Sequence, residues 1–208
     1  MGIQGTGAET VSPTSEVRER LTDAVTRVAT ECGYPSVDIE QIAQYAGVSV
    51  EEFHRHFESK DQCLMAAYDR FLERMLEHID EACEDAENWP EKVKRTIESA
   101  FDFVAELHGG ARLFTVDAMR AGPAALERSC NSVASAALRL KHGRLLFPAA
   151  ADMPEPTERT LVAGVVMIAS TQLLGEEADQ LPRLAPEAVE MVLTPYVGAR
   201  RARFIATS

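Results

Sequence analysis

Hydrophobic residues recur along this chain at intervals of three and four, which is the spacing of one face of an α-helix. The first such stretch runs from Val17 to Cys32, where Gly33 supplies a stop signal. A second stretch keeps the spacing from Leu64 to Cys83, about five turns, which is long enough to connect two domains. No segment alternates hydrophobic and polar residues, so the pattern predicts an all-α fold without a sheet.

Between these stretches the chain carries three residue pairs with the spacing of a capping box, in which each member pairs an otherwise unbonded N–H at a helix start. The pairs are Asp38 with Gln41, Ser49 with Glu52, and Ser59 with Gln62. They predict that three helices begin here, at sharply separated positions. We therefore expect a disordered arm over residues 1–13, a three-helix domain over 14–60, and a larger helical domain over 61–208.

The rest of the chain repeats the same pattern of caps, prolines and glycines. We expect a helix that starts at Trp89 and ends at Gly109-Gly110, a short one over Ala111–Met119, a longer one after Gly122-Pro123, a loop over Phe147–Pro156, and two final helices over Glu155–Ala178 and Pro186–Phe204. Pro195 is expected to kink the last of these helices.

The segment from Leu161 to Leu174 is apolar on nearly every side, and few other helices remain to cover it. This predicts a second copy of the chain as the cover, in a four-helix contact with the last helix. Burial within one chain is the alternative. The candidate interface residues are Leu161, Val165, Ile168, Val189, Val192 and Tyr196.

Composition places this chain among globular proteins, with 46% hydrophobic and 26% charged residues. The net charge of −12 opposes nucleic-acid binding, because phosphate contacts favour a basic surface. The longest apolar run is too short to span a bilayer, and without a signal peptide we expect a cytoplasmic protein. Four cysteines without C-x-x-C spacing favour buried packing over metal binding or redox chemistry.

One constellation has the spacing of two helices that cross at a tight turn. Ala43 is small where the helices touch, Gly47 suits the left-handed turn, and Phe53 and Phe57 hold the second helix to the core. The outer face of that second helix is then free to enter a major groove.

The residues around this constellation are Gly33-Tyr34, Ile42-Ala43, Ala46-Gly47-Val48-Ser49, Phe53-His54-Arg55-His56-Phe57 and Ser59-Lys60-Asp61. Over about residues 14 to 72 they resemble the amino-terminal signature of the TetR family of transcriptional regulators. The resemblance implies a homodimer that places two recognition helices in successive major grooves of double-stranded operator DNA, with Lys60 on a phosphate. The implied DNA-binding residues are Ser49, Val50, Glu51, Glu52, His54, Arg55, His56 and Lys60. Glu52 also suits a capping role.

The resemblance also implies that a ligand in the carboxyl-terminal domain changes the spacing of the two DNA-binding domains of the dimer and thereby releases the promoter. We therefore expect a ligand-responsive repressor that needs no cofactor or metal and has no membrane partner. A small apolar ligand would lie among Trp89, Phe101, Phe103, Phe114, Met119 and Met167, residues that also suit plain core packing.

Residues 14–70 hold six basic side chains against eleven acidic ones. This keeps open an alternative, in which a TetR-like scaffold has lost DNA binding and serves as a protein-interaction or ligand-sensing module. An enzyme is not expected: His108-Gly109-Gly110 superficially resembles an oxyanion loop, but no G-x-S-x-G motif follows it.

Overall fold

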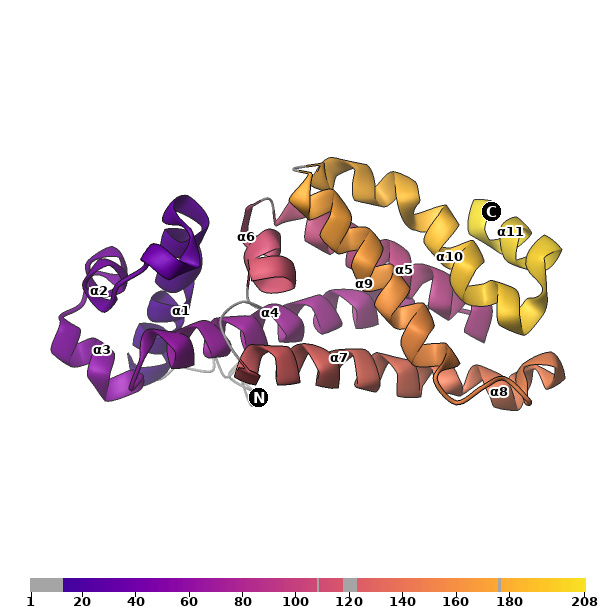
Figure 1. Cartoon of the computed structure of the whole chain (residues 1–208), viewed down its shortest axis with the longest axis horizontal. Coiled ribbons are helices and arrows are strands. Elements are labelled where there is room, and N and C mark those ends of the chain that lie inside the picture. The colour runs from indigo at the N-terminus through magenta and orange to yellow at the C-terminus, as the bar shows by residue number, and fades with distance from the viewer. Residues whose placement is uncertain (1–12, 108, 118–122, 176) are drawn as a thin grey trace, which may run out of the picture. The chain divides into compact units, whose positions relative to one another are not determined.

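The structure is a computed structural model that describes residues 13–107, 109–117, 123–175 and 177–208. Every regular element within these ranges is helical (Figure 1), which confirms the predicted all-α class. Residues 1–12 of the predicted arm, His108 and Met119 lie outside the described residues. The chain divides into two compact units, Met1–Ala67 and Tyr68–Ser208.

Four helices build the described part of the first unit. They are α1 (Pro13–Cys32), α2 (Ile39–Ala46), α3 (Val50–His56) and the first residues of α4 (Lys60–Cys83), with a short 3-10 turn, η1 (Tyr34–Ser36), after α1. Helix α1 begins at Pro13, the last residue of the predicted arm. Leucine, isoleucine and phenylalanine side chains from all four helices fill one core, and those of Leu21, Ile42, Phe53 and Leu64 have no exposed surface.

The three predicted helix starts are confirmed, although the caps differ in detail. Asp38 and Gln41 form a complete capping box at α2. Ser49 and Ser59 accept the N–H groups three residues on, at 3.0 and 3.2 Å. Their predicted partners do not reach back to them: the Glu52 carboxylate pairs with side chains of its own helix, and Gln62 accepts the N–H of Glu58.

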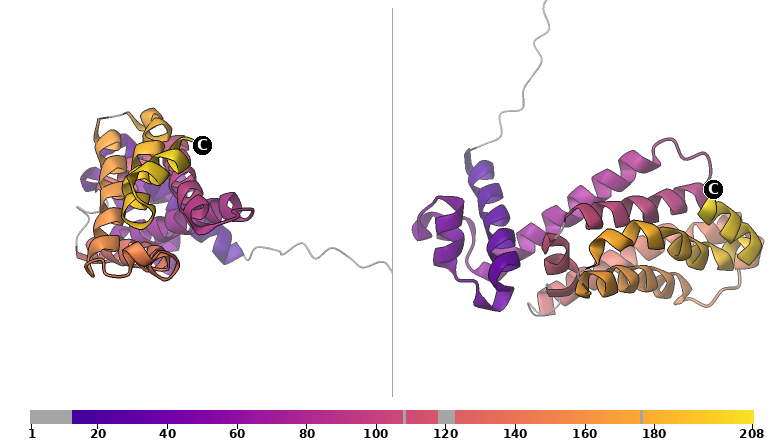
Figure 2. Two further views of the ribbon diagram at one scale, coloured as in Figure 1. Left: turned by 90° about the vertical axis from the view of Figure 1, so that its right-hand side faces the viewer. Right: turned by 90° about the horizontal axis from the view of Figure 1, so that it is seen from above.

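The second unit contains the remainder of α4 and the rest of the chain. Its further elements are α5 (Trp89–Glu106), α6 (Gly109–Arg112), the π-helical turn η2 (Leu113–Asp117), α7 (Pro123–Lys141), α8 (Gly143–Leu146), η4 (Pro148–Ala150), α9 (Thr157–Leu174), η5 (Ala178–Gln180), α10 (Leu181–Val197) and α11 (Ala199–Thr207). Figure 2 shows α10 beside α5 and α9, with α11 folded back along α10. Helix α7 packs against α9.

Several predicted boundaries in this unit are wrong, including the start of the last predicted helix, which lies at Leu181 and not at Pro186. Gly109 and Gly110 begin α6, whereas α5 already ends at Glu106. The predicted last helix is two helices. Gly198 takes a positive φ of 79°, which ends α10 before α11 begins. Pro195 lies inside α10, one turn before that break.

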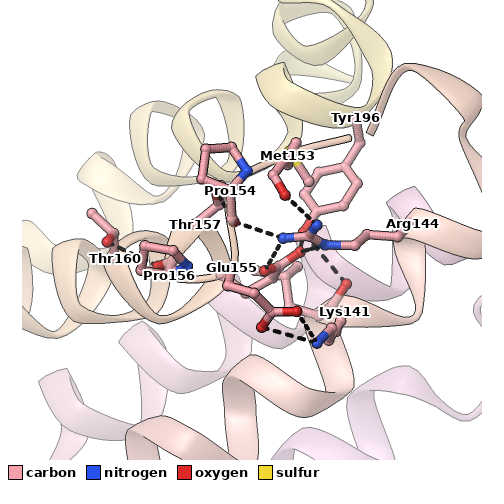
Figure 3. A network of polar contacts seen from close by, with 11 residues as sticks. Lys141, Arg144, Met153, Pro154, Glu155, Pro156, Thr157, Thr160 and Tyr196 are labelled. Atoms are coloured by element: carbon pink, nitrogen blue, oxygen red, sulfur yellow. Dashed lines mark hydrogen bonds and ion pairs between the residues drawn. The ribbon is translucent and has the colours of Figure 1, made fainter. Parts of the chain in front are cut away.

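A buried polar network joins α8, α9 and α10 in the second unit (Figure 3). Arg144 forms a two-pronged ion pair with Glu158, with Nε–Oε1 at 2.6 Å and Nη2–Oε2 at 2.8 Å. The same guanidinium donates to the Met153 and Pro154 carbonyls, and the Tyr196 hydroxyl donates to Glu158 Oε1 at 3.2 Å. Glu158 is only 2% exposed, and its bonds to Arg144 hold the pKa of the carboxyl below its usual value.

The cysteine prediction is correct for only two of the four. Cys63 and Cys83 are buried, but Cys32 and Cys130 are exposed, so the latter are not core residues. In the described part of the chain no group of three or more metal-ligating side chains comes together. No described helix combines the length and apolar character that crossing a bilayer requires.

Candidate nucleic-acid interface

Helix α3 presents a polar face to solvent because its two aromatic residues hold the opposite face in the core. Phe53 and Phe57 are 0% and 1% exposed, with ring centroids 5.8 Å apart. Helical spacing then directs the intervening side chains outward. The exposed residues of this predicted recognition helix and its cap are Ser49, Val50, Glu51, His54 and Arg55.

The turn between α2 and α3 has the predicted glycine geometry. Gly47 ends α2 in the left-handed region, at φ 66° and ψ 39°, and the Val48 N–H donates to the Ala43 carbonyl at 2.9 Å. Ala43 is 2% exposed, so the two helices pack closely at this point. A side chain at position 47 would be strained and would also meet the Arg20 guanidinium.

Two arginines of α1 hold this helix pair in place. Arg20 donates to the last carbonyl of α2, that of Ala46, and to the Gly47 carbonyl. Arg18 donates to the His56 carbonyl at the end of α3, and its guanidinium lies 4.4 Å above the Phe57 ring centroid. Both helix ends thereby gain donors for carbonyls that would otherwise be unpaired. The sequence gives no local signal for these contacts, since they join segments 26 to 38 residues apart.

Both carboxylates of α3 bind its arginine. Arg55 pairs with Glu51 at 2.8 Å and with Glu52 at 2.6 Å, and hydrogen bonding to Glu51, the largest cause, raises the pKa of Arg55. The second Glu52 oxygen lies 3.4 Å from His56 Nε2. The His56 side chain is only 7% exposed, so it is not available at the surface and we remove it from the predicted DNA contacts.

Lys60 is tied into the fold as well. Its ammonium donates to the Val37 carbonyl at 2.6 Å and lies 5.1 Å from the centroid of the Tyr34 ring. The Tyr34 hydroxyl in turn donates to Asp61. Lys60 therefore joins the start of α4 to the segment before α2, and it is only half-buried, with further N–H donors on its ammonium.

The charge pattern of the first unit follows from these contacts. Every basic side chain described between residues 13 and 67 has a partner within the protein: Arg18, Arg20, Arg27, Arg55 and Lys60.

Sequence reasoning also missed two exposed residues of α2, Gln44 and Tyr45, of which the tyrosine is 52% exposed. Their signal was available, because the spacing places them opposite the buried Ile42 and Ala46.

The model of the family described as "Bacterial regulatory proteins, tetR family" matches residues 21–67, which include α2, α3 and their turn. The amino-terminal helices of this chain are therefore similar to those of the TetR family. Two curated relatives from Mycolicibacterium smegmatis are the transcriptional activator FasR, 28% identical over 101 residues, and the transcriptional repressor KstR, 36% identical over 67 residues. These matches cover 49% and 32% of this chain, but only 46% and 33% of the relatives.

Two solved structures have a similar fold over nearly all of this chain. The fatty acid degradation regulator FadR from Bacillus halodurans has a TM-score of 0.75 and 18% identity, covering 92% of this chain and 99% of its own. FadR from Bacillus subtilis, in complex with stearoyl-CoA, has a TM-score of 0.70 and 17% identity, covering 86% and 98%.

The predicted pocket residues fall into separate places. Phe103 and Phe114 both contact Phe71, with ring centroids at 5.7 and 4.9 Å, and Tyr68 joins the same cluster. Trp89 instead packs against Phe147 and Tyr196 at 5.6 and 4.8 Å. Phe101 is buried, whereas Met167 is 65% exposed on α9 and is removed from the predicted pocket.

The predicted dimer residues of α10 are also corrected. Val189, Val192 and Tyr196 are at most 3% exposed, because α10 is covered by other helices of its own chain. Leu161, Val165 and Ile168 on α9 are half-buried. The exposed large apolar side chains described in the second unit lie on α7, α8, α9 and α11: Leu126, Leu138, Leu145, Leu146, Val166, Met167, Leu174 and Phe204.

Proposed function

We propose that this protein is a ligand-responsive DNA-binding regulator of the TetR family, acting in the cytoplasm as a repressor that a small molecule releases from its operator. The exposed polar face of α3 carries this proposal, because it is held outward by a rigid aromatic core and by the α1 arginines. The family model spans the same helices. The proposed DNA contacts are Ser49, Val50, Glu51, His54 and Arg55, with Lys60 and Tyr45 at the margins of the face.

A selection from random-sequence duplex DNA with the purified full chain tests this function. At low salt we expect enrichment of two related half-sites about 10 base pairs, or a multiple of that, apart. Binding should weaken as salt rises, because phosphate contacts release counterions. Stearoyl-CoA, found in the Bacillus subtilis FadR structure, is then added to the complex, with resorcinol, the ligand of the neighbour RolR, as a second compound. Release by either compound would support the ligand-responsive part, and release by neither would argue against these two ligand classes.

A second function is favoured by one observation. Each basic side chain described in residues 13–67 has a protein partner, and acidic residues outnumber basic ones in this region. Such a surface would suit a scaffold that has lost DNA binding and acts as a protein-interaction or ligand-sensing module. Enrichment of no sequence at low salt would favour this alternative over the regulator.

The proposed regulator acts as a homodimer, since two half-sites need two DNA-binding domains. We place the contact on α9, where Val166 and Met167 are 39% and 65% exposed. Replacing Met167 with glutamate is expected to convert the dimer to a monomer, because a dimer would bury the new charge without a partner. Analytical ultracentrifugation measures the change. Phe204→Glu, at a 72% exposed apolar position of α11, is the control and should remain dimeric. A Met167→Glu dimer as tight as the wild type would remove α9 from the interface.

A further inference from the structure

The two acidic residues at the start of α3 differ sharply in their surroundings. The Glu52 side chain is 29% exposed and is held on two sides, by Arg55 and by His56. The Glu51 side chain is 80% exposed, and within the described chain its contact is a single bond to Arg55. Glu52 therefore orients its neighbours on the helix, while Glu51 keeps most of its acceptor capacity free on the outer face.

Arg55 lies one turn after Glu51, so the pair places an acceptor and a donor side by side. Glu51 Oε1 accepts from Arg55 Nη2 at 2.8 Å, and the Arg55 side chain is 63% exposed. A carboxylate only accepts hydrogen bonds and a guanidinium only donates them. Arg55 uses one N–H on Glu51 and another on Glu52, so its other N–H groups remain available to a base edge.

This arrangement complements one kind of base-pair edge. In the major groove, cytosine presents an amino donor, and the guanine paired with it presents two acceptors. Thymine offers an acceptor and a methyl group, which oppose a carboxylate, and adenine has acceptors on both sides of its amino group, its own N7 and thymine O4, whereas the cytosine amino group has an acceptor on one side only. We infer that Glu51 and Arg55 act together as a reading element for a C·G base pair, with Glu51 accepting from the cytosine amino group and Arg55 donating to guanine.

The inference makes Glu51 a specificity-determining residue and rests on the proposed DNA-binding function. At a sequence without cytosine in this place, the Glu51 carboxylate loses water without gaining a donor and is repelled by phosphate. Glu51 thereby weakens binding to unselected DNA more than binding to the operator. The acidic residues of α3 then lower affinity for other sequences and do not indicate that DNA binding has been lost.

The test repeats the DNA selection with Glu51→Gln and with the wild type. The wild type should enrich a C·G pair at one fixed position of each half-site. In Glu51→Gln the preference at that position should fall about tenfold, because a lost charge-assisted contact to one base pair changes discrimination by roughly that much. Affinity for unselected DNA should rise. Exposed ion pairs contribute little to stability, so this variant is expected to fold.

Glu187→Gln is the matched control, since it makes the same charge change at an exposed position of α10 in the second unit. It should keep the C·G preference of the wild type. Failure of the wild type to enrich any sequence would overturn the proposed function itself. Enrichment by the wild type together with an unchanged C·G preference in Glu51→Gln would overturn only the role of Glu51.

Discussion

Replacing Arg144 with methionine is expected to lower Tm by about 10 °C, because it leaves a buried carboxylate without its counter-ion. Glu158 is 2% exposed and takes two of its three hydrogen bonds from this guanidinium. Methionine fills a similar volume, so the loss reports the unpaired charge rather than a cavity. The Met153 carbonyl loses the Arg144 donor and the Pro154 carbonyl keeps only its bonds from Thr157, which should loosen the segment between α8 and α9. Calorimetry of the full chain measures the change.

Lys141→Met is the control for this variant. Lys141 forms an ion pair with Glu155 in the same region, but the two side chains are 43% and 82% exposed. Exposed pairs contribute little, so the control should change Tm by about 2 °C or less. An Arg144→Met protein as stable as this control would show that the buried pair is not a source of stability.

The same pair predicts how stability depends on pH. The pKa of Glu158 is lowered in the folded protein, so its contribution is fully present above the unfolded value of about 4.3. It is lost as pH falls through the lower folded value. Tm of the wild type should therefore fall more steeply than that of Arg144→Met below about pH 4.

Local chemistry made the helix starts predictable. Asp38, Ser49 and Ser59 each pair a backbone N–H three residues on, which requires no knowledge of the rest of the fold. The Arg144–Glu158 pair lies on two helices, so no short spacing indicates it. The same holds for Arg18 and Arg20, whose partners are 26 to 38 residues away.

The candidate site could be predicted only in part from the sequence, for a related reason. Helical spacing correctly placed Phe53 and Phe57 in the core and Glu51 and His54 outside. It could not show that His56 turns toward Glu52, because spacing gives the average direction of a side chain and not its partner. The dimer prediction failed on α10 because the break at Gly198 was missed. The segment after it folds back as α11 and helps to cover α10 within the same chain.

Replacing Phe53 with alanine is expected to destabilise the first unit by about 3–5 kcal/mol, since the ring has no exposed surface and its removal leaves a cavity. Phe53 and Phe57 are the two aromatic side chains that α3 and its cap bury in the core, so α3 loses much of its attachment without the Phe53 ring. A unit of this size has little stability to spare, and it should unfold while the second unit remains folded.

Hydrogen exchange read by mass spectrometry separates the two units in the Phe53→Ala protein. Amides of α1, α2 and α3 should lose protection, those of α5, α9 and α10 should keep it, and binding to the selected DNA should disappear. Val50→Ala is the matched control, because Val50 lies on the same helix but is 37% exposed. It should change stability by only about 0.5 kcal/mol. Full protection of α1 to α3 in Phe53→Ala would mean that the helix pair is held without this ring, and that the arginines of α1 suffice to keep α3 in place.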